Sequence, residues 1–303
     1  MRTRLVLGSF TPSILLRVAR ELGQLAEQDL DVVEQAVTSS AAQFRALVDG
    51  QLDVVLTSPD NVLAYRLLPN NPLGEIVDVK IVSAVDRGLG LALFSGPGVN
   101  SVAELRGATF AVDVPNSGFA FVMYALAERL GLPRGEYSVM PLGSTPRRLA
   151  ALMAGTCDAT MLNAGNDLVA SAAGCAELGQ VTDVAPAYLG TVLASSGESD
   201  PEAVARLGAA LRAASAAVLS DTVDDLAGAL AGDVLKLPPD LARSYVRTMK
   251  NLRHGLIPDG RVDRPSMEAV VRLRRRFEPA WLDGVDLLAN ALKPALGLIA
   301  PPS

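Results

Sequence analysis

Small polar side chains follow several apolar runs of this sequence, at positions where they could hydrogen-bond a small ligand. The runs "RLVLGS", "LDVVLTS", "ATFAVDV" and "DATMLN" are typical of buried strands. Predicted helices begin soon after them, and the free backbone N–H groups of a helix start attract anions. The candidate ligand-binding residues are Ser9, Phe10, Thr11, Ser39, Ser40, Thr57, Ser58, Asp60, Asn61, Asn116, Ser117, Gly118, Phe119 and Asn163.

Each Ser, Thr or Asn of this set could instead serve only as a helix N-cap, and the convergence of several favours ligand contact. Arg87 is a further candidate, because it stands beside the first predicted hinge, where a guanidinium could pair with a carboxylate, sulfonate or phosphate of the ligand; it could equally be a surface hinge residue. Asp60 in the same cleft favours an amine or a hydroxyl over a simple dianion. Arg147 and Arg148 begin a predicted helix, where we expect exposed arginines. The predicted pocket is therefore of mixed polarity.

Signatures of catalysis and metal binding are scarce. The sequence has one histidine, His254, near the end of a predicted helix, and two cysteines, Cys157 and Cys175. It contains no HExxH or CxxC motif, no P-loop and no dinucleotide fingerprint. No catalytic residue, metal site or cofactor is predicted, and whether the protein is an enzyme stays open.

Composition limits the classes of partner. The net charge of -6 and the pI near 5.0 argue against nucleic acid as a partner. No apolar stretch is long enough to predict a membrane-spanning helix. The first residues, "MRTRLVLGSF", show no signal peptide, so the chain as written is expected in the cytoplasm. It would be periplasmic or extracellular if a signal had been removed.

The elements that must position these residues alternate between strand and helix up to about residue 200. A helix is predicted over 12–28, and four helices are predicted beyond Pro201. Strands that alternate with helices at this spacing predict an α/β protein with parallel sheets. Ligands of such sheets bind beyond the carboxyl ends of the strands, where the candidate residues stand.

One phrase occurs twice in the chain, 105 positions apart: "LVDGQLD" at 47–53 and "LMAGTCD" at 152–158. In each copy a helix is predicted to end at the glycine, which supplies the positive φ of a C-cap. The leucine three residues earlier is expected to be buried, and the aspartate opens the next strand. Because the match extends into the preceding helix, it predicts two similar α/β units whose strand ends face one ligand.

The segments "GSFTPS", "QFRALVDGQLDVVLTSPDN" and "VNSVAELRGATFAVDVPNSGFAFVMYALAERLGL" resemble the type II periplasmic substrate-binding proteins. The branch they resemble serves nitrate, taurine, alkanesulfonates and thiamine precursors. The resemblance implies two parallel or mixed sheets flanked by helices, in two lobes joined by two hinge strands, at 84–93 and 188–196. Lobe one would comprise 1–86 and the mostly helical return 189–303, and lobe two 87–188.

Two functions are compatible with that resemblance. The first is a binding protein that closes on a small anionic or zwitterionic metabolite and, if exported, delivers it to an ABC permease. The second is a cytoplasmic enzyme on the same fold that acts on a small ring carboxylate, such as a chorismate-dehydratase-like lyase or a decarboxylase. The cysteine-rich motif of the pyrimidine-forming relatives has no counterpart here, which argues against their iron-dependent chemistry.

Overall fold

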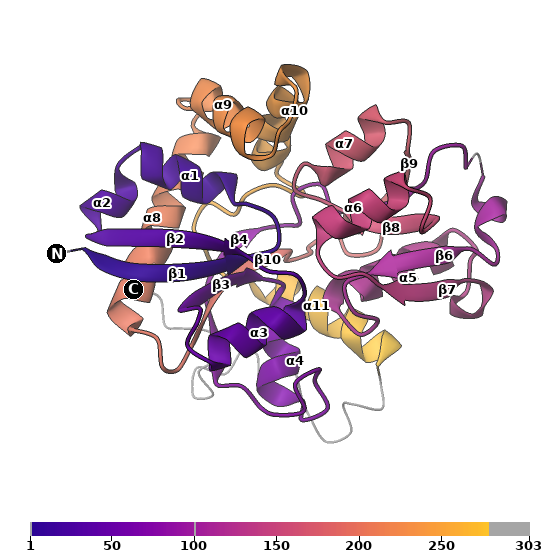
Figure 1. Cartoon of the computed structure of the whole chain (residues 1–303), viewed down its shortest axis with the longest axis horizontal. Helices are drawn as coiled ribbons and strands as arrows, with labels where there is room; N and C mark the ends of the chain where they lie inside the picture. Colours follow the sequence, from indigo (N-terminus) through magenta and orange to yellow (C-terminus); the bar gives the residue numbers. More distant parts are fainter. Residues whose placement is uncertain (1, 100, 279–303) are drawn as a thin grey trace.

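Two five-stranded sheets form the framework of the protein (Figure 1). The computed structural model describes residues 2–99 and 101–278. The first sheet has the order β2-β1-β3-β10-β4, and the second has the order β7-β6-β8-β5-β9. Both sheets are mixed, because β10 in the first and β5 in the second run antiparallel to their neighbours. The prediction of an α/β fold with two parallel or mixed sheets is confirmed, and both sheets are of the mixed kind.

Apolar residues on alternate sides of the first sheet explain its two helical layers. Leu5, Leu7 and Val54 face one layer of helices, and Val55 and Ile81 face the other. The strands are β1 (Thr3–Ser9), β2 (Leu30–Ala36), β3 (Val54–Thr57), β4 (Val79–Asp86) and β10 (Thr191–Ser196). The helices of this first part are α1 (Ile14–Glu21), α2 (Gln24–Glu27), α3 (Ser40–Val48) and α4 (Pro59–Leu67).

The helix predicted over 12–28 is wrong as one piece. It divides into α1 and α2 at Gly23, whose φ of 76° lies in the left-handed region that ends a helix. The break turns α2 back onto β2.

The second sheet repeats this plan. Its strands are β5 (Ala92–Ser95), β6 (Thr109–Val112), β7 (Ser138–Pro141), β8 (Ala159–Leu162) and β9 (Ala176–Gln180). One face packs on α5 (Gly118–Arg129), and the other packs on α6 (Thr145–Met153) and α7 (Asn166–Ala172). Short 3₁₀ turns lie at Val102–Leu105, Arg134–Glu136 and Val181–Asp183.

The repeated phrase has the same structure in both copies. Helices α3 and α6 end just before Gly50 and Gly155, whose φ angles are 68° and 69°. The aspartates make equivalent hydrogen bonds: Asp53 Oδ2 accepts the N–H of Val6, and Asp158 Oδ2 accepts the N–H of Thr109, each at 2.7 Å. In both cases the carboxylate ties the end of the helix–strand joint to the neighbouring parallel strand. The repeat therefore marks equivalent places in the two sheets.

The chain passes between the sheets twice, from β4 to β5 through 87–91 and from β9 to β10 through 181–190. The two crossovers touch, because Gly190 N donates to Asp86 O at 2.9 Å and any Cβ on Gly190 would collide with the backbone of Gly88. They overlap the segments predicted as hinges, 84–93 and 188–196, and the hinge role stays a prediction. The lobe boundaries remain a prediction.

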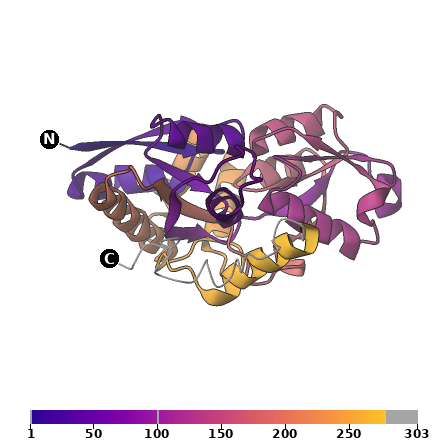
Figure 2. The same cartoon turned by 90° about the horizontal axis from the view of Figure 1, so that it is seen from below.

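Four helices follow the second crossover: α8 (Pro201–Leu219), α9 (Asp224–Val234), α10 (Pro239–Lys250) and α11 (Arg264–Phe277). Helix α8 packs on β4 and α1, whereas α11 packs on both α4 and α5 (Figure 2). Residues 279–303 of the predicted return segment lie outside the described residues. Among the helices described, none alone is long and apolar enough to cross a bilayer; α8 and α9 would pass only as a pair, and they meet at 113°.

Candidate functional site

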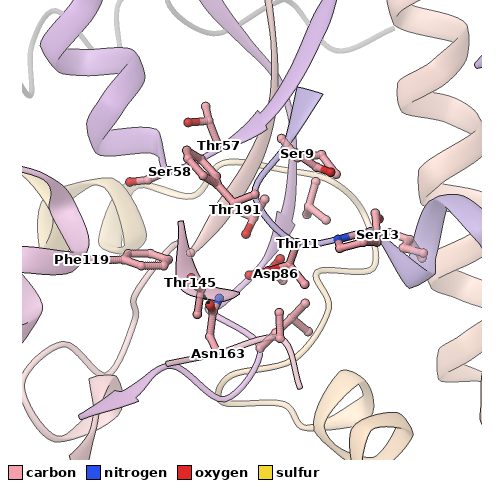
Figure 3. Close-up of a pocket in the computed structure, with 18 of the residues that line it drawn as sticks. Ser9, Thr11, Ser13, Thr57, Ser58, Asp86, Phe119, Thr145, Asn163 and Thr191 are labelled. Atoms are coloured by element: carbon pink, nitrogen blue, oxygen red, sulfur yellow. Dashed lines mark hydrogen bonds between the residues drawn. The ribbon is translucent and has the colours of Figure 1, made fainter. Parts of the chain in front are cut away.

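A cavity opens where the carboxyl ends of strands from both sheets meet (Figure 3). Its empty volume is about 960 Å³, counted with its open mouth. The lining residues are Ser9, Phe10, Thr11, Pro12, Ser13, Ile14, Leu15, Leu56, Thr57, Ser58, Asn61, Val85, Asp86, Leu89, Asp113, Ser117, Gly118, Phe119, Thr145, Arg148, Asn163, Ala164, Gly190, Thr191, Tyr245, Met249 and Leu256.

First-turn or capping residues of four helices contribute to this lining: Ser13 of α1, Ser58 of α4, Ser117 of α5 and Thr145 of α6. Two of these helices follow strands of the first sheet and two follow strands of the second. A helix start carries a partial positive charge and unpaired N–H groups. Together the four starts make the cavity wall electropositive at several points, which suits an anionic group.

On the side of the first sheet, the polar side chains are held by bonds within the protein. Ser9 Oγ donates to Glu34 Oε1 at 2.8 Å, and the same carboxylate oxygen accepts the N–H of Ser13 at 2.7 Å. Asn61 Nδ2 donates to Thr57 Oγ1 at 3.1 Å. These hydroxyls keep lone pairs for a ligand while their orientation is fixed.

On the side of the second sheet, Asn163 is fixed in the same way. Its Nδ2 donates to Gly88 O at 3.0 Å, and its Oδ1 accepts from Thr145 Oγ1 at 3.4 Å. The amide thus connects β8, α6 and the first crossover. Phe119 from α5 and Phe10 from the loop after β1 add aromatic surface to the polar groups.

Two carboxylates and one guanidinium supply the charge of the lining. Burial raises the pKa of Asp86, 1% exposed, to about 6, although Gly88 N (2.7 Å from Oδ1) and Thr191 oppose the shift by hydrogen bonding. Burial also raises the pKa of Asp113, against the opposing effect of Arg148 and of the nearby polar groups of Ser40. Buried carboxylates of this kind favour a ligand that brings a hydrogen-bond donor or a cation.

Arg148 is buried, 2% exposed, which corrects the expectation of an exposed arginine at this helix start. Its guanidinium donates to the carbonyl of Gly143, to Thr145 Oγ1 at 3.0 Å and to Met161 O at 3.2 Å. Burial lowers its pKa to about 10, and Asp113 acts in the opposite direction. Three of its hydrogen bonds thus go to the protein, its Nε is buried without a partner, and its charge balances Asp113 beside the cavity.

The family of this chain is shown by its sequence. Residues 16–229 match the model of the periplasmic substrate-binding proteins of phosphonate ABC transporters. The chain belongs to that family. No curated protein matches the sequence significantly.

Solved structures show the same fold at low identity. The alkanesulfonate-binding protein SsuA of Xanthomonas axonopodis, bound to MOPS, has a TM-score of 0.69 and 15% identity, covering 95% of each chain. The aliphatic sulphonate-binding protein SsuA of Escherichia coli has a TM-score of 0.68 and 17% identity over 100% of this chain and 94% of that one. The nitrate-binding protein NrtA of Synechocystis PCC 6803 has 0.70 and 16%, over 100% and 92%. The predicted family and fold are confirmed, and the enzyme alternative is not favoured.

The structure brings most of the predicted ligand-binding residues to one place. Those that line the cavity are Ser9, Phe10, Thr11, Thr57, Ser58, Asn61, Ser117, Gly118, Phe119 and Asn163. Their contact with a ligand remains a prediction. Among the described residues, no group of His, Cys, Asp or Glu is arranged to hold a metal ion.

The other five predicted residues lie outside the lining, and Asp113 explains two of them. Ser39 caps α3 by accepting the N–H of Ala42 at 3.2 Å, and Ser40 is fully buried. The carboxylate of Asp113 faces Ser40, and Ser144 N donates to Thr38 O at 3.0 Å. The start of α3 therefore meets a carboxylate from the second sheet's side and not the cavity.

Asp60, Arg87 and Asn116 are also placed elsewhere. Asp60 is buried in an ion pair with Arg274 of α11. Arg87 donates to Ser266 Oγ at 3.2 Å and to Asp263 Oδ2 at 3.3 Å, at the start of α11. Asn116 precedes the cap of α5 and is absent from the lining. The two charged candidates, Asp60 and Arg87, thus find their ion-pair partners in the C-terminal helix α11 and its cap. The sequence alone did not place that helix beside them.

Sequence reasoning missed Asp86, Asp113, Arg148 and Thr191. The repeat held a signal for one of them. An offset of 105 pairs Arg148 with Gln43, and both side chains donate to equivalent strand carbonyls, those of Met161 and Leu56. Only the structure shows that Asp113 is the counterpart of Phe10, since Leu7 pairs with Val54 as Phe110 pairs with Ala159.

Proposed function

We propose that this protein binds a small organic anion that also carries a hydrogen-bond donor, such as a zwitterion, and delivers it to an ABC permease on the periplasmic side of the membrane. The observation that carries the proposal is the cavity's charge pattern: four helix starts favour an anionic group, and two buried carboxylates, Asp86 and Asp113, favour a donor. Family membership supports the transport role.

The proposed ligand would lie with its anionic end towards the starts of α4 and α5 and its donor towards Asp86. Ser58 and Ser117, which cap these two helices, lie on the wall, and Asp86 lies at the crossover between the sheets. A plain dianion meets two carboxylates and one arginine that is already paired with one of them, so it binds less favourably. The two sheets with their helices would close on the ligand as lobes about the crossovers and exclude water.

Matched pairs of ligands test the class. Calorimetric titration with 2-aminoethylphosphonate and ethylphosphonate, and with taurine and ethanesulfonate, compares the same anion with and without an amine. We expect tighter binding of the amine-bearing member of each pair. Equal affinity within both pairs would contradict the requirement for a hydrogen-bond donor. If none of the four compounds bound, the assignment of a small organic anion as the ligand would be contradicted.

Alanine variants locate the site. Ser58→Ala and Asn163→Ala should weaken the ligand that binds best, because each removes a fixed polar group from the cavity wall. Asn116→Ala is the matched control, since that side chain lies next to α5 but outside the lining. Equal loss of affinity in all three variants would contradict the cavity assignment. Mass spectrometry of the recovered ligand would show it unchanged, and turnover would contradict a binding role.

A further inference from the structure

The tail helix α11 carries an arginine that bonds to both sides of the cleft. Arg274 is 1% exposed and lies between α4 and α5. Its Nε and Nη2 each donate to the carboxylate of Asp60 at 2.7 Å, a bidentate pair with the first part of the chain. Its Nη2 also donates to the carbonyl of Asn116 at 3.1 Å, directly before α5.

Each bond partner stands next to a cavity wall. Asp60 lies in the first turn of α4, two residues from the cap Ser58, and Asn116 immediately precedes Ser117, the cap of α5. The two helix starts touch, because a Cβ on Gly118 would lie 2.7 Å from Asp60 Cβ and 3.0 Å from Ser58 Oγ. One guanidinium thus bonds to the starts of two helices, one of which follows a strand of the first sheet and the other a strand of the second.

Helix α11 is anchored more firmly to α5 than to α4. Phe277 stacks on Phe121 with ring centroids 6.1 Å apart and meets Tyr124 edge-on at 5.4 Å. The Arg274 guanidinium itself lies 5.0 Å from the centre of the Phe121 ring, and Arg276 pairs with Glu128. Since α5 covers the second sheet, α11 would move with that sheet when the two separate.

The bond to Asp60 is therefore the one that an opening motion must break. Breaking it would leave a carboxylate with 0% exposure without its only ion-pair partner among the described residues. A buried charge that loses its partner is strongly unfavourable, unless water enters with the motion. This contact opposes opening independently of any ligand.

We propose that Arg274 is a positioning residue for ligand binding: a latch that holds the starts of α4 and α5 together and so keeps the cavity in its closed form. Arg274, Asp60 and the carbonyl of Asn116 are called the tail latch below. The effect on ligand affinity rests on the proposed function, whereas the effect on closure does not.

The first test measures closure without ligand. Spin labels at Gln35→Cys and Ala150→Cys, both exposed and on opposite sides of the cavity, report the distance between the two sheets by pulsed electron resonance. Arg274→Lys and Asp60→Asn should add a longer-distance population that the parent protein lacks. Arg276→Gln is the matched control, because it removes an ion pair to α5 from the same helix at an exposed position.

A variant that merely unfolds would mislead, so the double change Asp60→Asn with Arg274→Met removes both charges together. Replacing both members of a buried pair avoids an orphaned charge, and the fold should persist, as circular dichroism will show. The double variant should also show the longer distances. Unchanged distances in folded Arg274→Lys and in the double variant, or an equal shift in Arg276→Gln, would overturn the proposal.

The second test uses 2-aminoethylphosphonate as the probe. If the closed fraction falls to about a tenth in Arg274→Lys, the apparent affinity falls about tenfold, because only the competent fraction binds. Arg276→Gln should leave the affinity unchanged. Distances that shift while the probe binds neither the parent nor the variant would support the latch and count only against the proposed function. A shift in distance with unchanged affinity would overturn the link between the latch and binding.

Discussion

Replacing Asp86 by asparagine should change how the stability of this protein depends on pH. The folded protein raises the pKa of Asp86 from 3.8 to about 6, chiefly by burial. Between these two values the folded state holds a proton that the unfolded chain has lost. The contribution of Asp86 to the unfolding free energy is therefore fully present below about pH 4 and is lost as the pH rises through about 6.

The size of the loss follows from the shift. A difference of about 2 pKa units at about 1.4 kcal/mol each makes about 3 kcal/mol, with no discount for solvent because the side chain is 1% exposed. Asparagine keeps an oxygen for the N–H of Gly88 but cannot ionise. Relative to the parent, Asp86→Asn should thus gain about 3 kcal/mol of unfolding free energy between about pH 4 and pH 8.

Urea denaturation at the two pH values measures this difference. The pKa values of Asp113 and Asp167 are also raised, the latter to about 7, so the parent alone would show their combined effect. Subtracting the parent from the variant isolates Asp86, and Asp49→Asn, an exposed carboxylate, serves as the control. The reasoning is refuted if Asp86→Asn differs from the parent by the same free energy at both pH values.

Three further tests, with four substitutions, concern the framework and the cavity. Arg148→Gln should fold, because Gln43 makes the equivalent bond in the first half of the chain. It should weaken ligand binding, because Asp113 loses the cation beside it. An unchanged affinity in calorimetric titration would contradict this expectation. Gly118→Ala should lower the unfolding free energy by about 1–3 kcal/mol in urea, because its Cβ meets that of Asp60 at 2.7 Å, and a neutral effect would mean that α4 and α5 separate freely. Asp53→Ala should lower the unfolding free energy by about 1–3 kcal/mol, because the carboxylate bonds a neighbouring strand. Asp158→Ala should lower it less, because Asp158 makes the equivalent bond at an exposed position. A larger effect of Asp158→Ala in thermal melts would contradict that account.

The sequence predicted the framework because its signals are local. Apolar runs, helix caps and the glycines after α3 and α6 act within a few residues, so the repeated joint and all strands except β9 could be placed from them. Strand β9 was missed because it is a short edge strand with no apolar run. The break at Gly23 escaped because the apolar pattern continues through α2, and only the left-handed φ of that glycine shows the turn.

The charged part of the site could not be predicted in the same way. Asp60 looked like a ligand contact, but its partner Arg274 lies 214 residues further along the chain. Arg87 does lie beside a crossover, as the sequence predicts, but its side chain pairs with Asp263 and Ser266 of the tail. Burial by a distant segment decides whether a charge is free for a ligand, and no local pattern carries that information.

The paired crossovers have a mechanical consequence. The two segments are joined at each end, by Gly190 N to Asp86 O and by Val181 N to Leu91 O, each at 2.9 Å. Two joined connections resist twisting and sideways shear more than a single connection would. If the two halves move as lobes, we therefore expect a rotation about one axis, which would return the side chains facing each other across the cavity to the same register.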